Sequence, residues 1–441
     1  MKNSIAGIVS IFFLLTAFSE GETTSDETYR ELDLLAKVLE LVKDTYVEEV
    51  DERQLLEAAI RGMLNDLDPH SGYMDASIFR ENQIQTRGEY GGLGIEVLGE
   101  NGALKVIAPM DDTPASRAGI QTGDFITHIE GESLSDMDQN EAVENLRGIV
   151  GTEVTITIVR PSENKTFDVK LTREVISISA VRHRIERGEI GYLRLNTFNN
   201  EKLTQDLKKA IRDIKREAGD NLKGYILDLR NNPGGLLDQA IEVSDVFLER
   251  GEVVSIRGRQ KSENARWNAT RGDDTGGLPL IVLINAGSAS ASEIVAGALQ
   301  DHKRATILGI ESFGKGLVQT VYPLADDRAV RITTARYYTP SGRSIQTLGI
   351  KPDIIVEQPI FDSEGNPVNF QRERDLSGHI PNENGDTASN EETPVAQALI
   401  RPAPVVDEDG NFEDYQLNYA LDLLTGVIEM GQRQALLEAA E

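Results

Sequence analysis

The stretch Gly287-Ser288-Ala289-Ser290-Ala291-Ser292-Glu293 follows an apolar run at Leu280–Ile284. An apolar run of this length predicts a buried strand, and the residues after it predict a turn that passes directly into a helix. A serine at such a helix start lies among backbone N–H groups that no helical carbonyl accepts, and these groups can stabilise an oxyanion. The pattern therefore favours an α/β core with Ser290 where the strand meets the helix.

A second stretch, Phe313-Gly314-Lys315-Gly316, places an amine 25 residues after Ser290. A serine hydroxyl needs a base to take its proton, and an amine can serve only where desolvation lowers its pKa. The apolar neighbours Phe313, Leu317 and Val318 could supply that environment. Ser290 and Lys315 together suggest a hydrolase that does without histidine.

Both stretches also have purely structural interpretations. Serines followed by Glu293 are the pattern of a helix N-cap, and composition alone does not choose among Ser288, Ser290 and Ser292 as the nucleophile. The spacing from Gly309 to Lys315 imitates a phosphate-binding loop. Glycine follows the lysine, where a nucleotide site needs serine or threonine, so we expect no nucleotide.

Histidine is the alternative base. The chain has five histidines, and only His302 lies near the serine stretch in the sequence; the full set is His70, His128, His183, His302 and His379. Separation in sequence does not exclude a Ser–His pair in space, so this alternative stays open. No cluster has metal-ligand spacing, and we expect neither a metal nor another cofactor.

Taken in order, the motifs resemble peptidase family S41, the carboxyl-terminal processing proteases, which are tail-specific serine proteases with a PDZ domain. The resemblance extends from about Leu32 to Val356 and includes further segments, namely Asp68-Pro69-His70-Ser71, Gly91-Gly92-Leu93-Gly94-Ile95 and Tyr337-Tyr338-Thr339-Pro340-Ser341-Gly342. It implies that Ser290 is the nucleophile and Lys315 the base. It also implies that Gln319 orients the lysine, since an amide does so without raising the amine's pKa as an acid would.

An oxyanion hole needs a second donor besides the amide of Ala291. The glycine pair in Asp228-Leu229-Arg230-Asn231-Asn232-Pro233-Gly234-Gly235 is the candidate source. We expect Gly235 to supply this donor, because backbone without a side chain can approach the carbonyl closely.

Short β runs broken by glycine, from Thr86 to about Arg173, resemble a PDZ domain of circularly permuted protease type. Its peptide-binding residues would be Gly92, Leu93, Gly94 and Ile95, whose amides could hold a peptide carboxylate while the peptide adds a strand beside residues 95–98. A plain glycine-rich turn is the alternative. Arg147 resembles a family arginine that couples PDZ occupancy to the active site.

The N-terminus has the order of a secretory signal. Met1-Lys2-Asn3 precedes an apolar run from Ile5 to Phe18, and Ala17-Phe18-Ser19 fits a cleavage site. We therefore expect residues 1–20 to be a signal peptide and the protein to be periplasmic, with an uncleaved anchor as the alternative. The absence of cysteine excludes disulfides and a thiol nucleophile.

The expected fold class is multidomain α+β. A helical N-terminal segment, 27–85, corresponds to the dimerisation segment of the family and suggests a homo-oligomer, although its helices could equally pack on the body. A PDZ domain (86–174) and a protease core (175–357), crotonase-like by resemblance, follow. Residues 358–441 are expected to form a flexible linker and a C-terminal helix, which could pack on the chain itself or on a partner.

The chain has 441 residues, of which 73 are acidic and 45 basic, for a formal net charge of −28. Such acidity argues against nucleic acid or anionic membranes as partners. The sequence thus predicts an exported serine endopeptidase that recognises the C-termini of protein substrates, with an activating adaptor protein as a further partner. Alternatives are a non-catalytic PDZ adaptor on an inactive protease fold and a ligand-binding protein on the same fold.

Overall fold

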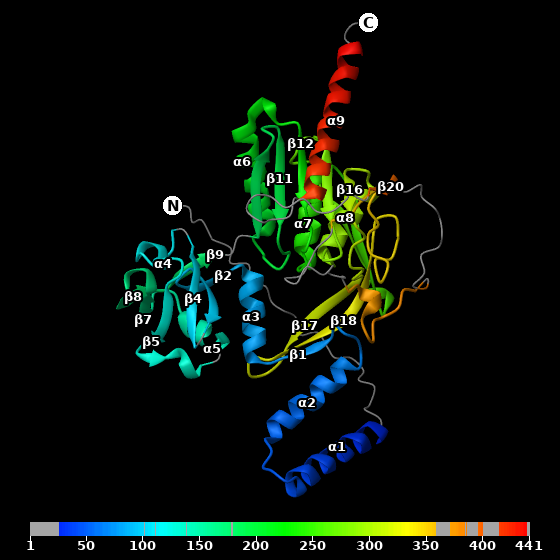
Figure 1. Cartoon of the computed structure of the whole chain (residues 1–441). Coiled ribbons are helices and arrows are strands. Elements are labelled where there is room, and N and C mark those ends of the chain that lie inside the picture. Colours follow the sequence, from blue (N-terminus) through cyan, green and yellow to red (C-terminus); the bar gives the residue numbers. More distant parts are fainter. Residues whose placement is uncertain are drawn as a thin grey trace, which may run out of the picture. The chain divides into compact units, whose positions relative to one another are not determined.

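The computed structural model describes residues 26–100, 102–110, 112–137, 139–177, 180–358, 371–383, 385, 396–399 and 414–438. The predicted signal peptide and most of the predicted linker lie outside these ranges. The chain divides into one compact unit that ends at Met63 and a larger one that begins at Leu64. Figure 1 labels the elements of both.

Two amphipathic helices, α1 (Asp26–Thr45) and α2 (Glu52–Asn65), make up the N-terminal part. Lys43 Nζ donates to Glu52 Oε2 at 2.6 Å and thereby joins the two helices. Helix α1 has no buried residue, and its apolar side chains, Leu32, Leu35 and Val38 among them, are exposed in the single chain. No helix in the described ranges is long and apolar enough to cross a membrane.

The PDZ segment forms a six-stranded sheet of order β3-β4-β5-β7-β8, with β6 on β5. Its strands are β3 (Ile95–Glu100), β4 (Ala103–Pro109), β5 (Phe125–Ile129), β6 (Glu132–Ser133), β7 (Glu153–Arg160) and β8 (Lys165–Thr172); its helices are α4 (Pro114–Arg117) and α5 (Gln139–Leu146). A two-stranded ribbon, β2 (Glu89–Gly92) with β9 (Glu174–Ser177), lies at its two chain ends. Strand β3 is an edge strand of the sheet, so one side of its backbone is open to a further strand.

A seven-stranded sheet of order β10-β11-β12-β15-β16-β19-β20 forms the centre of the protease core. The strands are β10 (Val181–Glu186), β11 (Ile190–Leu195), β12 (Gly224–Asp228), β15 (Leu280–Ile284), β16 (Thr306–Gly309), β19 (Ile354–Val356) and β20 (Ala396–Leu399). All neighbours from β11 to β20 pair in parallel, while β10 pairs antiparallel with β11. The carboxyl ends of the parallel strands therefore meet at one edge, where the loops that follow them can come together.

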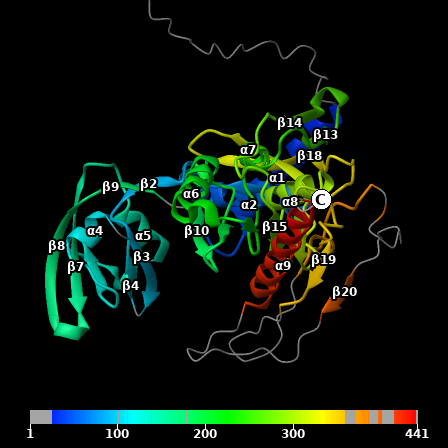
Figure 2. The same ribbon diagram turned by 90° about the horizontal axis from the view of Figure 1, so that it is seen from above.

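Helices cover both faces of this sheet. On one face lie α6 (Leu203–Ala218), α7 (Leu237–Phe247) and α8 (Ala291–Asp301), which share a core with Leu227 and Val282. On the other face α9 (Tyr415–Glu438) packs on Tyr192, Ile226 and Ile281, and Figure 2 shows α9 on the opposite side from α7 and α8. Because both faces are covered, Leu280–Ile284 is buried at every position.

A second, five-stranded antiparallel sheet was not predicted. It has the order β1-β18-β13-β14 with β17 also on β18, and comprises β1 (Gly72–Met74), β13 (Gly251–Gly258), β14 (Ala265–Ala269), β17 (Leu317–Pro323) and β18 (Ala329–Tyr338). Helix α3 (Ala76–Arg87) follows β1. Short 3₁₀ turns occur at Leu134–Asp136, Pro161–Glu163, Gly219–Asn221, Lys261–Glu263 and Glu373–Asp375. This sheet carries the strand that begins two residues after Lys315.

The region after the core departs from the flexible linker that its composition predicts. In residues 371–383, Glu373 is fully buried and Asn382 Nδ2 donates to the Gln346 carbonyl at 2.6 Å. The C-terminal helix packs on the chain itself along Leu417, Leu421 and Leu424. Residues 371–383 are polar in composition, yet buried hydrogen bonds hold them on the core.

Replacing Leu424 with alanine tests the packing of α9. Leu424 is buried against the sheet, whereas Val427 on the same helix is 42% exposed. We expect Leu424→Ala to lower the free energy of unfolding by about 2–5 kcal/mol, and Val427→Ala by less than about 0.5 kcal/mol, in urea unfolding followed by circular dichroism. Equal effects of the two changes would contradict the assigned orientation of α9.

Candidate active site

Ser290 occupies the turn between β15 and α8 in a strained backbone conformation, with φ +53° and ψ −111°. A non-glycine residue at positive φ is uncommon and is tolerated where the surroundings enforce it. The residue is buried, and its side chain lies within hydrogen-bonding reach of the Tyr337 hydroxyl. Complete burial raises the pKa of Tyr337 to about 12, so this neighbour stays a neutral hydroxyl.

The other two serines of the stretch have structural partners. Ser288 Oγ donates to the Leu229 carbonyl at 2.8 Å, and Ser292 Oγ donates to the Asn232 carbonyl at 2.9 Å. Both bonds fasten the serine turn to the loop after β12. Composition could not distinguish the three serines, but their hydrogen bonds do. Ser288 and Ser292 each donate to one of these backbone carbonyls, and Ser290 donates to neither.

The carboxylate of Glu293 joins the serine turn to the lysine loop. Its Oε2 accepts from the Ser290 amide at 2.7 Å and from the Lys315 amide at 2.9 Å, and its Oε1 accepts from the Gly314 amide at 2.7 Å and from Ser312 Oγ at 2.5 Å. Complete burial raises the pKa of Glu293 to about 7, against the opposing effect of these donors. An anion that belongs to the chain therefore occupies the amide nest of the Gly314-Lys315 turn, which argues against a phosphate there.

Lys315 is partly buried, and desolvation together with the nearby charge of Arg331 lowers its pKa to about 8. The carboxylates of Glu373, Glu293 and Asp68 act in the opposite direction. A lysine with this pKa is a free amine in an appreciable fraction of molecules near neutral pH. A lowered pKa is what a lysine needs in order to act as a base.

The structure does not join the three predicted triad residues by hydrogen bonds. Among the described residues, Lys315 Nζ bonds neither Ser290 Oγ nor Gln319. Gln319 lies on β17 opposite Thr333, next to a register shift at Val318, and its Nε2 is buried without a hydrogen-bond partner. A buried amide donor without a partner is costly, so its position needs a further reason.

The glycine pair of the expected oxyanion hole lies beside two different segments. A Cβ on Gly234 would come within 2.9 Å of both the Ala291 nitrogen and the Ser290 Cβ, so Gly234 abuts the serine turn, whereas a Cβ on Gly235 would meet the backbone of Phe198 and Asn199. The Gly234 amide already donates to Asn232 Oδ1 at 3.0 Å. The amides of Gly235 and Ala291 make no hydrogen bond with any described residue.

Comparison with known proteins bears on the whole chain. The model of peptidase family S41 matches residues 189–356, that of the PDZ domain matches 91–171, and that of the activating protease CtpB N-terminal domain matches 15–78. A carboxy-terminal-processing protease of Bartonella bacilliformis is 50% identical over 418 residues, which are 94% of this chain and 93% of that protein.

The chain belongs to peptidase family S41. A probable CtpA-like serine protease of Staphylococcus aureus is 34% identical over 82% of this chain and 71% of its own length. Among solved structures, a photosystem II D1 C-terminal processing protease is 30% identical, with a TM-score of 0.43 over 76% of this chain and 96% of that one. The resemblance seen in the sequence and the multidomain α+β fold class are confirmed, and the chain belongs to the family of C-terminal processing proteases.

In this S41 protease the Asp68-Pro69-His70-Ser71 motif supports the β17–β18 hairpin. Asp68 Oδ1 accepts from the amides of His70 and Ser71, each at 2.8 Å, and Ser71 Oγ accepts from the Thr333 amide at 3.2 Å. Thr333 is the cross-strand partner of Gln319. The motif that marked the family in the sequence thus holds the strand beside Gln319.

Glu373 is a site residue that the sequence analysis missed, and its partner His70 lay in a quoted motif without an assigned contact. Glu373 Oε2 lies 2.7 Å from His70 Nε2, and the Glu373 amide donates to the Phe313 carbonyl at 3.1 Å. Glu373 thus holds the residue two before Lys315. It stands alone in a polar region, so no motif could have signalled it, whereas Tyr337 and Glu293 lay in quoted motifs without an assigned role.

The predicted PDZ residues lead into the edge strand of the PDZ sheet, and Gly92, Leu93 and Gly94 are buried in the single chain. Gly92 ends β2, Gly94 has φ +73°, and Ile95 begins the edge strand β3. The amides of Leu93 and Gly94 make no hydrogen bond within the described residues. Both observations are compatible with the predicted carboxylate-binding loop.

Arg147 lies away from the serine and lysine loops. Its Nη1 pairs with Glu81 of α3 and donates to Glu144 at 2.9 Å, and its guanidinium lies 4.9 Å from the centre of the Tyr90 ring. It therefore links the PDZ helix α5 to α3, and among the described residues it bonds no predicted catalytic side chain.

Replacing Glu293 with glutamine tests the link between the two loops. The amide would turn an NH₂ group toward two backbone or hydroxyl donors, so we expect the free energy of unfolding to fall by about 2–3 kcal/mol and proteolysis to be lost. Glu249→Gln, at an exposed site, is the matched control and should change neither. Urea unfolding and cleavage of β-casein are the measurements; a Glu293→Gln enzyme as stable and active as the parent would contradict the assigned role.

The pH dependence of kcat/KM tests the lysine environment. A base whose pKa is about 8 is protonated at lower pH, so kcat/KM should rise toward pH 8 and level off above it. An inflection near 10.5 would indicate an unperturbed lysine. One between 6.5 and 7 would report a histidine or Glu293, whose pKa is raised to about 7, and would contradict the lysine base.

Proposed function

We propose that this S41 protease is an exported serine endopeptidase that cleaves peptide bonds with Ser290 as nucleophile, Lys315 as general base and Gln319 as the group that orients the lysine. The observation that carries the proposal is the shared carboxylate of Glu293, which fixes the backbone of Ser290 and of Lys315 against each other. The lowered pKa of Lys315 and the engaged hydroxyls of Ser288 and Ser292 support the same assignment.

The reaction would proceed in two transfers. Lys315 Nζ takes the proton of Ser290 Oγ as the oxygen attacks the scissile carbonyl, and it returns that proton to the leaving amine. Water then attacks the acyl-enzyme with the same amine as base. The amides of Ala291 and Gly235, which no other described group uses, would hold the oxyanion in both steps.

Lys315 must approach Ser290 before reaction, because in the described conformation Ser290 faces Tyr337 and no bond joins serine and lysine. Gln319 would then accept a hydrogen bond from the lysine amine through its side-chain oxygen, which leaves the lone pair of the amine free to act as base. The described conformation is that of a resting enzyme. Occupation of the PDZ segment, or an activating adaptor, would supply the free energy for the shift.

Substrate recognition is proposed for the PDZ segment. Gly92, Leu93, Gly94 and Ile95 would bind the carboxylate of a protein C-terminus, and the peptide would pair with the open edge of β3. Arg147, which bridges α5 and α3, would transmit occupancy toward the core. The match of residues 15–78 to the N-terminal domain of an activating protease, and the exposed apolar side of α1, support assembly of copies through this segment.

Export rests on the N-terminal sequence, with its basic start and apolar run, and the proposed compartment is the periplasm. The carboxy-terminal-processing name of the Bartonella relative supports protein C-termini as substrates. Neither nucleic acid nor nucleotide has a place in this function, given the acidic chain and the occupied Gly314-Lys315 nest.

Substitution of Ser290 with alanine tests the nucleophile. Cleavage of an unfolded protein with an apolar C-terminus should fall by at least about 10³-fold, because the oxyanion donors alone cannot replace the nucleophile. Ser262→Ala, at an exposed position, should cleave as the parent does. Equal cleavage by Ser290→Ala and the parent would refute Ser290, and a parent that binds the substrate but cleaves nothing would favour the adaptor alternative.

A further inference from the structure

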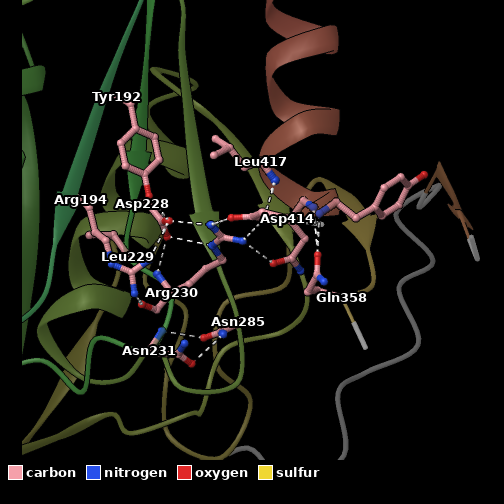
Figure 3. Close-up of polar contacts among 12 residues, drawn as sticks. Tyr192, Arg194, Asp228, Leu229, Arg230, Asn231, Asn285, Gln358, Asp414 and Leu417 are labelled. Carbon is pink, nitrogen blue, oxygen red and sulfur yellow. Dashed lines mark hydrogen bonds and ion pairs between the residues drawn. The ribbon is translucent and has the colours of Figure 1, made fainter. Parts of the chain in front are cut away.

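A charged network connects the start of the C-terminal helix to the loop that carries the glycine pair (Figure 3). Arg230 Nη1 donates to Asp414 Oδ1 and Arg230 Nη2 donates to Asp414 Oδ2, each at 2.7 Å. Arg230 also donates to both oxygens of Asp228, from Nε at 3.0 Å and from Nη2 at 2.7 Å. One guanidinium is thus held by one carboxylate of the protease core and one from the start of the C-terminal helix.

The network is mostly buried and electrically balanced. The Asp228 side chain is 0% exposed and that of Arg230 is 8% exposed, whereas Asp414 is 41% exposed. Tyr192 donates its hydroxyl to Asp228 Oδ2 at 2.7 Å, and Arg194 pairs with the same oxygen at 3.1 Å. Two arginines thus face two aspartates, and loss of one carboxylate leaves a buried cation without its counter-charge.

The carboxylate of Asp414 is itself fixed. Its Oδ1 accepts from the Leu417 amide at 3.0 Å, so it caps the first turn of α9 while binding Arg230. The same turn is also tied to β19 and the residues that follow it, because Gln416 Nε2 donates to the Val356 carbonyl at 2.7 Å and Gln358 Oε1 accepts from the Tyr415 amide at 2.8 Å. Asp414 thus connects Arg230 to α9, the helix that packs on this face of the sheet.

On the other side, the backbone leads from Arg230 through Asn231 and Asn232 to the glycine pair, and hydrogen bonds hold each of these three residues. The Arg230 amide donates to Asp228 Oδ1 at 2.9 Å, and Asn231 exchanges two bonds with Asn285 at 2.9 and 2.8 Å. Asn232 follows, and its Oδ1 accepts from the Gly234 amide. Asn285 begins the serine turn, so its bonds with Asn231 also fix the loop after β12 relative to the turn that carries Ser290.

We propose that Asp414 is a positioning residue for the oxyanion loop, and that its pair with Arg230 sets the catalytic competence of the protease. The inference rests on the proposed function of Ser290 and Gly235. Asp414 touches neither substrate nor nucleophile; it holds Arg230, and Arg230 holds the backbone that leads to Gly235.

The physical reason is the tolerance of an oxyanion donor. A donor must lie within a few tenths of an ångström of the position that the oxyanion occupies, and a small displacement weakens transition-state binding without weakening substrate binding. With asparagine at 414, the NH₂ group would face one guanidinium nitrogen and the charge of the pair would be lost. Arg230 would then adjust toward Asp228 and draw Asn231 with it.

The test compares Asp414→Asn with Asp422→Asn in the full-length protein. Asp422 also lies on α9 and also pairs with an arginine, with Oδ1 2.7 Å from Arg187 Nη2, but its side chain is 72% exposed and it is outside the network. The readouts are kcat and KM for β-casein and the rate at which a fluorophosphonate probe labels Ser290, a reaction that also develops charge in the oxyanion hole.

We expect Asp414→Asn to lower kcat and the labelling rate about tenfold, less than the loss of a whole donor, with KM within about twofold of the parent. Asp422→Asn should leave all three unchanged, and Asp414→Glu, which keeps a carboxylate for Arg230, should recover most of the lost rate. Hydrogen exchange of the α9 amides in Asp414→Asn should match the parent, which separates a displaced loop from an undocked helix.

Three results would overturn the inference. Labelling of Asp414→Asn at the parental rate would show that the pair does not position the loop. Equal losses in Asp414→Asn and Asp422→Asn would show a general weakening of α9. A parent in which Ser290 is not labelled at all would instead refute the proposed nucleophile, and this inference with it.

Discussion

One buried carboxylate decides how the candidate active site is put together. Glu293 accepts four hydrogen bonds, one from the Ser290 amide and three from Ser312, Gly314 and Lys315. Without it, four donors would lie buried without partners. The two loops come from different places in the fold, one from the end of β15 and the other from the connection between β16 and β17. They meet because each needs the same anion.

A second constraint acts on the loop after β12. Its carbonyls accept from Ser288 and Ser292, and Asn231 and Asn285 bond each other, so this loop and the serine turn form one hydrogen-bonded layer. The site therefore consists of three loops held edge to edge, with side chains of modest size between them. This explains why glycine recurs there, since a Cβ at Gly234 would collide with the serine turn.

Much of this arrangement could be predicted from the sequence. The buried run Leu280–Ile284 became a strand with the predicted bounds, and the predicted helix follows the serine turn, because both patterns reflect burial in a sheet covered on two faces. The segment after Glu357 could not be predicted in this way. Glu373 is held by bonds to His70, Gln346 and Phe313, all distant in sequence, and local composition does not record such pairings.

In the candidate site, too, features that local motifs display could be predicted, and features that depend on distant contacts could not. The residue types, the spacing of serine and lysine and the amide at Gln319 followed from chemistry that local motifs display. The role of Glu293 did not, because the acid of a capping box and the anion of a two-loop clamp look alike in sequence. The role of Asp414 could not be predicted either, because it depends on a contact with Arg230, which lies 184 residues away in the sequence.

The most direct measurement is a crystal structure of the protein with a peptide boronate bound. We expect boron on Ser290 Oγ, one boronate oxygen within about 3 Å of the amides of Ala291 and Gly235, and Lys315 Nζ turned from its described position to within hydrogen-bonding distance of Ser290 Oγ. Boron on another residue, or an adduct on Ser290 with Lys315 still unbonded to it and the Gly235 amide turned away, would contradict the serine–lysine centre.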